Sequence, residues 1–231
     1  MTAPISNYFD EGKAFFDDGE YEQAIETFTK ALRLSLGDLA ETHLYRGICY
    51  AYLEAFDRAM SDFNDALRKN PYLADAYNER GNLYRMDTQY QLAVDDYNAA
   101  ITIDDAHYAA YYNRALAYEK LKQLPEAEAD LSRAIELNPD IIACYEARGR
   151  VRNELKQYGG AISDYSHFLE IGGGYEYDNQ SEVQSLIITL RINHFLSRFI
   201  PPRFLPDARL WAEKSMQTLD LLNDEIGTLD D

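Results

Sequence analysis

Apolar residues recur at helical spacing along most of the chain, in pairs of segments that short polar stretches separate. The first segments are versions of one pattern, and they read GKAFF at 12–16, LYRGICYAY at 44–52, YNERGNLYR at 77–85, YYNRALAYE at 111–119 and YEARGRVRN at 145–153. The second segments read YEQAIETFTKAL, FDRAMSDFNDAL, YQLAVDDYNAAI, LPEAEADLSRAI and YGGAISDYSHFL. Gly47 and Gly81 lie 34 residues apart in matching surroundings, which sets the period. The pattern predicts five helical hairpins, at 5–38, 40–73, 74–107, 108–141 and 142–175.

Two positions of each copy hold small residues, which let the two helices of a hairpin approach closely. The eighth position holds Gly12, Gly47, Gly81, Ala115 and Gly149, and the twentieth holds Ala24, Ala59, Ala93, Ala127 and Ala161. Bulky residues occupy positions 11 and 24, so knobs and holes alternate as a packed core requires. Pro71 and Pro139 stand where a helix has to stop, because proline cannot continue the backbone hydrogen bonds.

A pair of opposite charges also recurs with the period. The seventh position holds Arg46, Arg80, Arg114 and Arg148, and the twenty-third holds Asp62, Asp96, Asp130 and Asp164. Both positions flank the seam between the helices, so each carboxylate can meet a guanidinium of its own or the next hairpin. We interpret the two rows as a structural ladder, because an aspartate accompanies each arginine. A row of anion-binding arginines is the alternative.

The chain after about residue 175 departs from the repeat. Three glycines at 172–174 form a joint, and the segment 183–200 has the apolar spacing of one amphipathic helix. Prolines at 201, 202 and 206 break the chain, and Asp207 then caps a last helix that carries Trp211. We interpret 1–175 as the repeat domain and 176–231 as capping helices with an acidic tail. A dimerisation arm, or a segment folded into a groove, is the alternative.

Charge and composition narrow the function. The chain carries 40 acidic and 22 basic residues, a formal charge of −18, which argues against nucleic acid or anionic lipid as a ligand and favours a neutral or basic protein partner. Neither a secretory leader nor a run of about 20 apolar residues is evident, so a cytoplasmic protein without membrane insertion is expected. Cys49 and Cys144 read as buried free thiols.

Catalytic and metal chemistry find little support in the sequence. The four histidines are isolated from one another, and none has the spacing of a metal site. No glycine-rich phosphate loop and no nucleophile elbow is present. We therefore expect no enzyme activity, no cofactor and no metal.

The repeat resembles the tetratricopeptide repeat family in its small and large positions and its proline stop, over about three quarters of the chain. This resemblance implies an all-α fold, a right-handed solenoid of five helical hairpins followed by two C-terminal amphipathic helices. It also implies a non-catalytic adaptor that binds a peptide or helix of another protein in a concave groove. A self-associating module, in which the C-terminal helices form a homodimer, is the alternative.

In this family the groove is lined by positions 2, 5, 9, 12 and 13 of each first helix. We expect Asn78 and Asn82 to hydrogen-bond the main chain of an extended peptide, so that removing Asn82 leaves stability within about 0.5 kcal/mol of wild type. The full set of expected groove residues is Phe9, Lys13, Leu44, Ile48, Tyr52, Asn78, Asn82, Arg85, Tyr112, Leu116 and Arg150.

Overall fold

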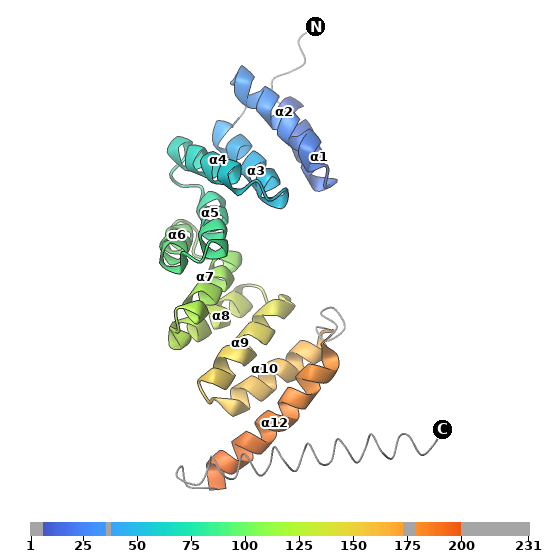
Figure 1. The fold of residues 1–231 in the computed structure, drawn as a ribbon, viewed down its shortest axis with the longest axis vertical. Helices are drawn as coiled ribbons and strands as arrows, with labels where there is room; N and C mark the ends of the chain where they lie inside the picture. Colours follow the sequence, from blue (N-terminus) through green and yellow to red (C-terminus); the bar gives the residue numbers. More distant parts are fainter. Residues whose placement is uncertain (1–6, 36–37, 173–178, 200–231) are drawn as a thin grey trace, which may run out of the picture. The chain divides into compact units, whose positions relative to one another are not determined.

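The computed structural model of the protein describes residues 7–35, 38–172 and 179–199. Within these ranges the chain forms eleven helices and no strand (Figure 1), which confirms the all-α class. It divides into two compact units, Met1–Asn138 and Pro139–Asp231. The first unit contains α1 Asn7–Asp17, α2 Tyr21–Leu34, α3 Leu39–Tyr52, α4 Phe56–Lys69, α5 Ala74–Met86, α6 Tyr90–Ile103, α7 Tyr108–Lys120 and α8 Leu124–Leu137. The second contains α9 Ile142–Glu154, α10 Tyr158–Glu170 and α12 Gln180–Phe199.

The helices of the first unit pair as consecutive hairpins, α1 with α2 through α7 with α8. Each hairpin turns through one residue in the left-handed conformation. Gly19 takes it with a φ of 77°, which costs a glycine nothing, whereas Glu54, Thr88 and Lys122 take it with φ near 60° despite their side chains. The second helix of each hairpin contacts the first helix of the next, and α1, α3, α5 and α7 also contact in sequence.

The predicted seam of small residues is confirmed in atomic detail. A Cβ atom added at Gly47 would lie 2.7 Å from Cε1 of Phe63, and one added at Gly81 would lie 2.7 Å from Cε1 of Tyr97. Both rings are fully buried, so neither has free space to move into. Only a hydrogen fits beside an aromatic ring at this position. The alanines at position 20 of the repeats are also fully buried.

The arginine–aspartate ladder is confirmed as a structural device. Arg80 donates from Nε and Nη2 to the two carboxylate oxygens of Asp96, at 2.8 and 2.7 Å. Its third nitrogen, Nη1, donates to Oδ1 of Asn64 in the preceding hairpin at 2.8 Å. Arg46 and Arg114 make the corresponding bond to Thr29 and Asn98, so each of these three guanidiniums ties its own hairpin to the one before it. The same bidentate pairing joins Arg46 with Asp62, Arg114 with Asp130 and Arg148 with Asp164.

The second unit consists of the hairpin α9–α10 and the long helix α12, which packs on α10. The α12 helix buries Val183, Ile187 and Leu190, as expected for the amphipathic segment 183–200. Arg152, which stands where the pattern usually has an aromatic residue, donates to Oδ2 of Asp164 at 2.8 Å. The helix expected after Pro206 lies outside the described residues, so the capping role of 176–231 stays a prediction.

The described residues also bear on the expectations for the two cysteines and for membrane insertion. Cys49 and Cys144 are free and buried, and burial raises the pKa of each thiol to about 12, which makes both thiols unreactive. None of the described helices combines the length and the apolar character that a membrane crossing requires.

Candidate functional site

The first helices α1, α3, α5 and α7 form a row within the first unit, since each contacts the next. We call this set the first-helix row. Ten of the eleven expected groove residues lie on it. The remaining one, Arg150, lies on α9 in the second unit and forms an ion pair with Glu146 at 2.7 Å.

Aromatic side chains gather at the α1–α3 end of the row. Tyr45 contacts the rings of Phe9 and Phe16, with centroids 5.8 and 5.5 Å apart. The ammonium of Lys13 lies 4.8 Å from the centre of the Tyr45 ring, and interaction with Tyr45 raises the pKa of Lys13. Tyr52 is 60% exposed. This end therefore offers a cation and an accessible ring beside a packed aromatic cluster.

One residue expected in the groove belongs to the hydrophobic core, and a second packs against that core. Leu44 is only 3% exposed and packs with Phe63 and Leu83, and Ile48 lies partly buried against the same cluster. The expectation for Leu44 is therefore wrong. The Leu44 side chain packs between α3 and the helices α4 and α5, which supply the surrounding core residues.

The two asparagines of α5 are held in an internal hydrogen-bond network. Asn78 and Asn82 each donate from Nδ2 to one carboxylate oxygen of Glu79, at 2.9 and 3.2 Å. Asn78 accepts from Nδ2 of Asn113 on α7 at 3.0 Å, and Asn82 accepts from the hydroxyl of Tyr97 at 2.9 Å. Asn78 is 4% exposed. Asn78 is too buried for a peptide to reach, so the expectation for it is wrong, whereas Asn82 is half-buried and its contact with a peptide stays a prediction.

Burial governs the titration of this network. It raises the pKa of Glu79, although the amides of Asn82 and Asn78 partly offset the effect, and it raises the pKa of the Tyr97 hydroxyl. Sequence reasoning missed Glu79 and Asn113, which both stand at the sixth repeat position. Their recurrence as polar residues one repeat apart is the signal that could have pointed to a contact between α5 and α7.

Arg85 is the expected groove residue with the most unusual surroundings. Its Nε atom is buried and has no hydrogen-bond partner among the described residues. The side chain lies beside the Tyr97 hydroxyl, where its charge and a hydrogen bond from its guanidinium lower the pKa of Tyr97 against the stronger effect of burial. On the next helix of the row, Tyr112 and Leu116 are half-buried.

A histidine also bridges two members of the row. His107 caps α7 by accepting from the backbone nitrogen of Ala110 at Nδ1, and its Nε2 atom lies 3.0 Å from Oδ1 of Asp75 on α5. This contact raises the pKa of His107 and lowers the pKa of Asp75. Neither the repeat pattern nor the spacing of these two residues predicts their contact.

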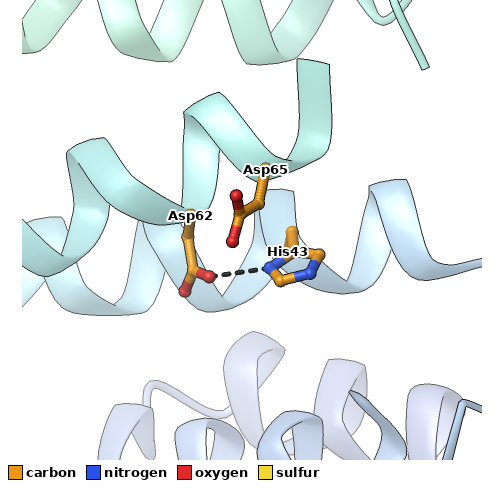
Figure 2. A group of neighbouring side chains, drawn as sticks. All are labelled: His43, Asp62 and Asp65. Carbon is orange, nitrogen blue, oxygen red and sulfur yellow. Dashed lines mark hydrogen bonds and ion pairs between the residues drawn. The ribbon is translucent and has the colours of Figure 1, made fainter. Parts of the chain in front are cut away.

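Figure 2 shows a cluster of His43, Asp62 and Asp65, whose ligand atoms lie within 4.8 Å of one another. The geometry does not suit a metal ion. Both oxygens of Asp62 accept from Arg46, and Oδ1 also lies 2.7 Å from Nδ1 of His43. Burial opposes the charge of Asp62, yet Arg46 and His43 hold its pKa below the usual value. A cation would have to displace a bidentate guanidinium, so we interpret the cluster as part of the ladder.

The short hairpins, their small-residue seam and the row of first helices define a helical-repeat protein. Residues 9–74, 74–107 and 108–141 match three family models, each described as tetratricopeptide repeat, which together cover more than half of the chain. The chain belongs to the tetratricopeptide repeat family.

Similar proteins share the fold over different lengths. Over 78 residues, or 34% of this chain, the sequence is 33% identical to Heat shock protein STI1 of Saccharomyces cerevisiae, and the match spans 13% of that protein. The structure of MamA 41-end from Desulfovibrio magneticus RS-1 has a TM-score of 0.64 at 23% identity, covering 74% of this chain and 96% of that one. A chain of the APC/C hetero-tetramer Cut9-Hcn1 has a TM-score of 0.70 at 22% identity, with coverage of 81% and 36%.

Proposed function

We propose that this protein is a non-catalytic adaptor that binds a peptide or helix of another protein along the first-helix row. Membership of the repeat family supports a role in protein–protein interaction. Stacked hairpins of this kind present extended binding surfaces, because only one face of each first helix packs into the hairpin seam. The concave groove and its residues are part of the proposal.

The observation that carries the proposal is the buried Nε–H of Arg85, which lacks an acceptor among the described residues. A buried donor without a partner costs about 1–3 kcal/mol. If the Arg85 side chain rotates to present this N–H, a carbonyl or carboxylate oxygen of a ligand removes that cost. Tyr52 of α3 and Tyr112 of α7 lie on neighbouring helices of the row and add amphipathic contact area. Lys13 supplies a second cation toward the α1 end.

The proposal keeps Phe9, Lys13, Tyr52, Arg85, Tyr112 and Leu116 as ligand contacts. It assigns Asn78 and Asn82 to the support of the site, because their acceptors are engaged within the protein. A ligand with an acidic side chain at Arg85, on a partner that is neutral or basic overall, fits both the local cation and the formal charge of −18.

Affinity capture followed by mass spectrometry identifies the partner, and calorimetric titration of that partner tests the site. Arg85→Ala should weaken binding at least about tenfold, which corresponds to about 1.4 kcal/mol. Arg133→Ala is the matched control, because it removes the same charge from α8, a second helix, where Arg133 is 44% exposed and pairs with Glu136 of its own helix. If Arg85→Ala and Arg133→Ala bind the partner with equal affinity, Arg85 is not a ligand contact.

One observation favours self-association as a second function. Ile188 and Phe195 of α12 are 49% and 61% exposed, although both are large and apolar. Light scattering over a dilution series decides between the two functions. A mass that doubles with concentration in wild type, and stays monomeric in Ile188→Glu, supports pairing through α12, whereas a constant mass excludes it.

A further inference from the structure

The junction between the second and third hairpins contains a pocket that the proposed ligand contacts do not line. It lies between α4 and α5, which pack directly against each other, and has a volume of about 360 Å³. That volume is at the small end of the range of ligand pockets, roughly 300–1,000 Å³. The lining residues are Phe56, Asp57, Met60, Leu83, Met86 and Asp87.

The pocket has an apolar base and an apolar mouth. Leu83 is 6% exposed and belongs to the core of the second and third hairpins, and Met60 packs against that core. Phe56 is 39% exposed and Met86 is 57% exposed. Exposed large apolar side chains around a hollow are typical of an interaction site, and methionine adapts its shape to what it contacts.

The junction between the first and second hairpins has an aromatic pair at the positions that correspond to this pocket. Phe56 stands at position 17 of its repeat, as Tyr21 does, and Met86 stands at position 13 of the following repeat, as Tyr52 does. Tyr21 and Tyr52 stack face to face, with centroids 4.6 Å apart and planes inclined by 3°. Because Met86 has no ring to place against Phe56, the protein leaves unfilled a position that an aromatic ring fills one repeat earlier.

The rim of the pocket is acidic. Asp57 and Asp87 are both exposed. Asp57 lies in the first turn of α4, where the helix dipole favours a negative charge, but Asp87 caps the C-terminal end of α5, where the dipole disfavours one. Asp87 accepts a hydrogen bond from Gln89, which is neutral. A cation from outside relieves the unfavourable charge at Asp87, and the formal charge of −18 attracts basic segments to this surface.

We propose that the α4–α5 pocket binds an aromatic side chain of a partner peptide in which lysine or arginine flanks the aromatic residue. The ring stacks on Phe56 and packs against Met60 and Met86. The flanking cations pair with Asp57 and Asp87. None of the ligand contacts proposed on the first-helix row lines this pocket, although Leu83 and Met86 lie on α5 of that row.

Methionine methyl groups report on the site directly. The chain has four methionines, of which Met60 and Met86 line the pocket, and the other two are Met1 and Met216. In protein labelled with ¹³C at these methyl groups, the acetylated and amidated peptide Gly-Lys-Phe-Arg-Gly should shift the Met60 and Met86 signals through the ring current of its phenylalanine. Peptides with alanine in place of phenylalanine, or with glutamate in place of both cations, should leave the signals unchanged.

The variant Met86→Tyr separates pocket binding from general damage to the fold. It should reproduce the Tyr21–Tyr52 stack against Phe56, raise the denaturant midpoint and reduce peptide affinity at least tenfold, as followed by the Met60 signal. Asp87→Asn should weaken binding several-fold at low salt. Arg85→Ala should leave the methyl shifts unchanged, so failure here and failure of the proposed function are distinguishable.

Four results overturn the proposal, of which three concern the added peptides. These three are unchanged peptide binding in Met86→Tyr, equal methyl shifts with the acidic peptide, and no shift of Met60 and Met86 with the basic peptide. Methyl signals that move when the protein alone is concentrated also overturn it, because a second copy of the chain then occupies the pocket.

Discussion

Gly47→Ala tests whether the seam of the second hairpin is closed to a single methyl group. A glycine inside a helix normally costs about 1 kcal/mol relative to alanine, so the change would stabilise an open site by about that amount. At Gly47 the added Cβ would lie 2.7 Å from Cε1 and 2.9 Å from Cδ1 of Phe63. Carbon atoms pack best at about 3.5–4.0 Å, so the ring would have to move by most of an ångström.

The packing around Phe63 decides whether the steric clash outweighs the gain in helix propensity. Phe63 is fully buried among Leu44, Leu67 and Leu83 and cannot swing into solvent. Overpacking of such a core costs about 1–3 kcal/mol, which exceeds the gain in helix propensity. We expect Gly47→Ala to lower the free energy of unfolding by about 1 kcal/mol, measured as a shift of the denaturant midpoint.

The fourth hairpin supplies the compensating change, because it combines Ala115 with Leu131 where the others combine glycine with an aromatic ring. Gly47→Ala and Phe63→Leu should therefore couple favourably by about 1 kcal/mol in a double-mutant cycle. Gly159→Ala is the control, since its Cβ would come no closer than 3.6 Å to a described side chain, His194, and it should not destabilise. Stabilisation by Gly47→Ala, or strict additivity with Phe63→Leu, refutes the reasoning.

Three further predictions follow from the polar contacts. Asn82→Ala should reduce stability by about 1–3 kcal/mol in denaturant titrations, because it leaves the buried Tyr97 hydroxyl without an acceptor; an unchanged midpoint contradicts the network. Asp96→Ala should reduce stability by up to about 3 kcal/mol, since it leaves Arg80 unpaired at a seam where that side chain is 20% exposed; a neutral result contradicts the ladder. Protonation of His107 removes the Nδ1 acceptor for Ala110, but the raised pKa, due first to Asp75, means that the fold still favours the charged form. The charged form therefore stabilises the fold below about pH 6.5, and this contribution is lost as pH rises through the folded pKa. Between about pH 6 and 8 the free energy of unfolding of the wild type should therefore fall relative to that of His107→Gln. The fall should be less than about 0.5 kcal/mol because Asp75 is 67% exposed, and parallel pH profiles of the two proteins contradict the pairing.

The limits of prediction are clearest on α5. From its sequence position Asn82 was expected to contact a ligand, yet its acceptor is taken by Tyr97, 15 residues away on α6. Asn78 likewise meets Asn113, 35 residues further along the chain. Which of several polar side chains on facing helices hydrogen-bond one another depends on the packing angle and the rotamers, and a spacing rule contains neither.

The sequence by itself determined the hairpins, the seam and the ladder. Each of these depends on contacts within one repeat or between neighbouring repeats, so one residue type at one position suffices to specify it, and the period multiplies the signal. The tertiary structure alone decided that Leu44 is core, that Arg85 keeps a buried nitrogen with no acceptor among the described residues, and that a pocket opens beside Met86. These outcomes depend on how closely side chains of different helices fill the space between them, and repeats with the same pattern fill it differently.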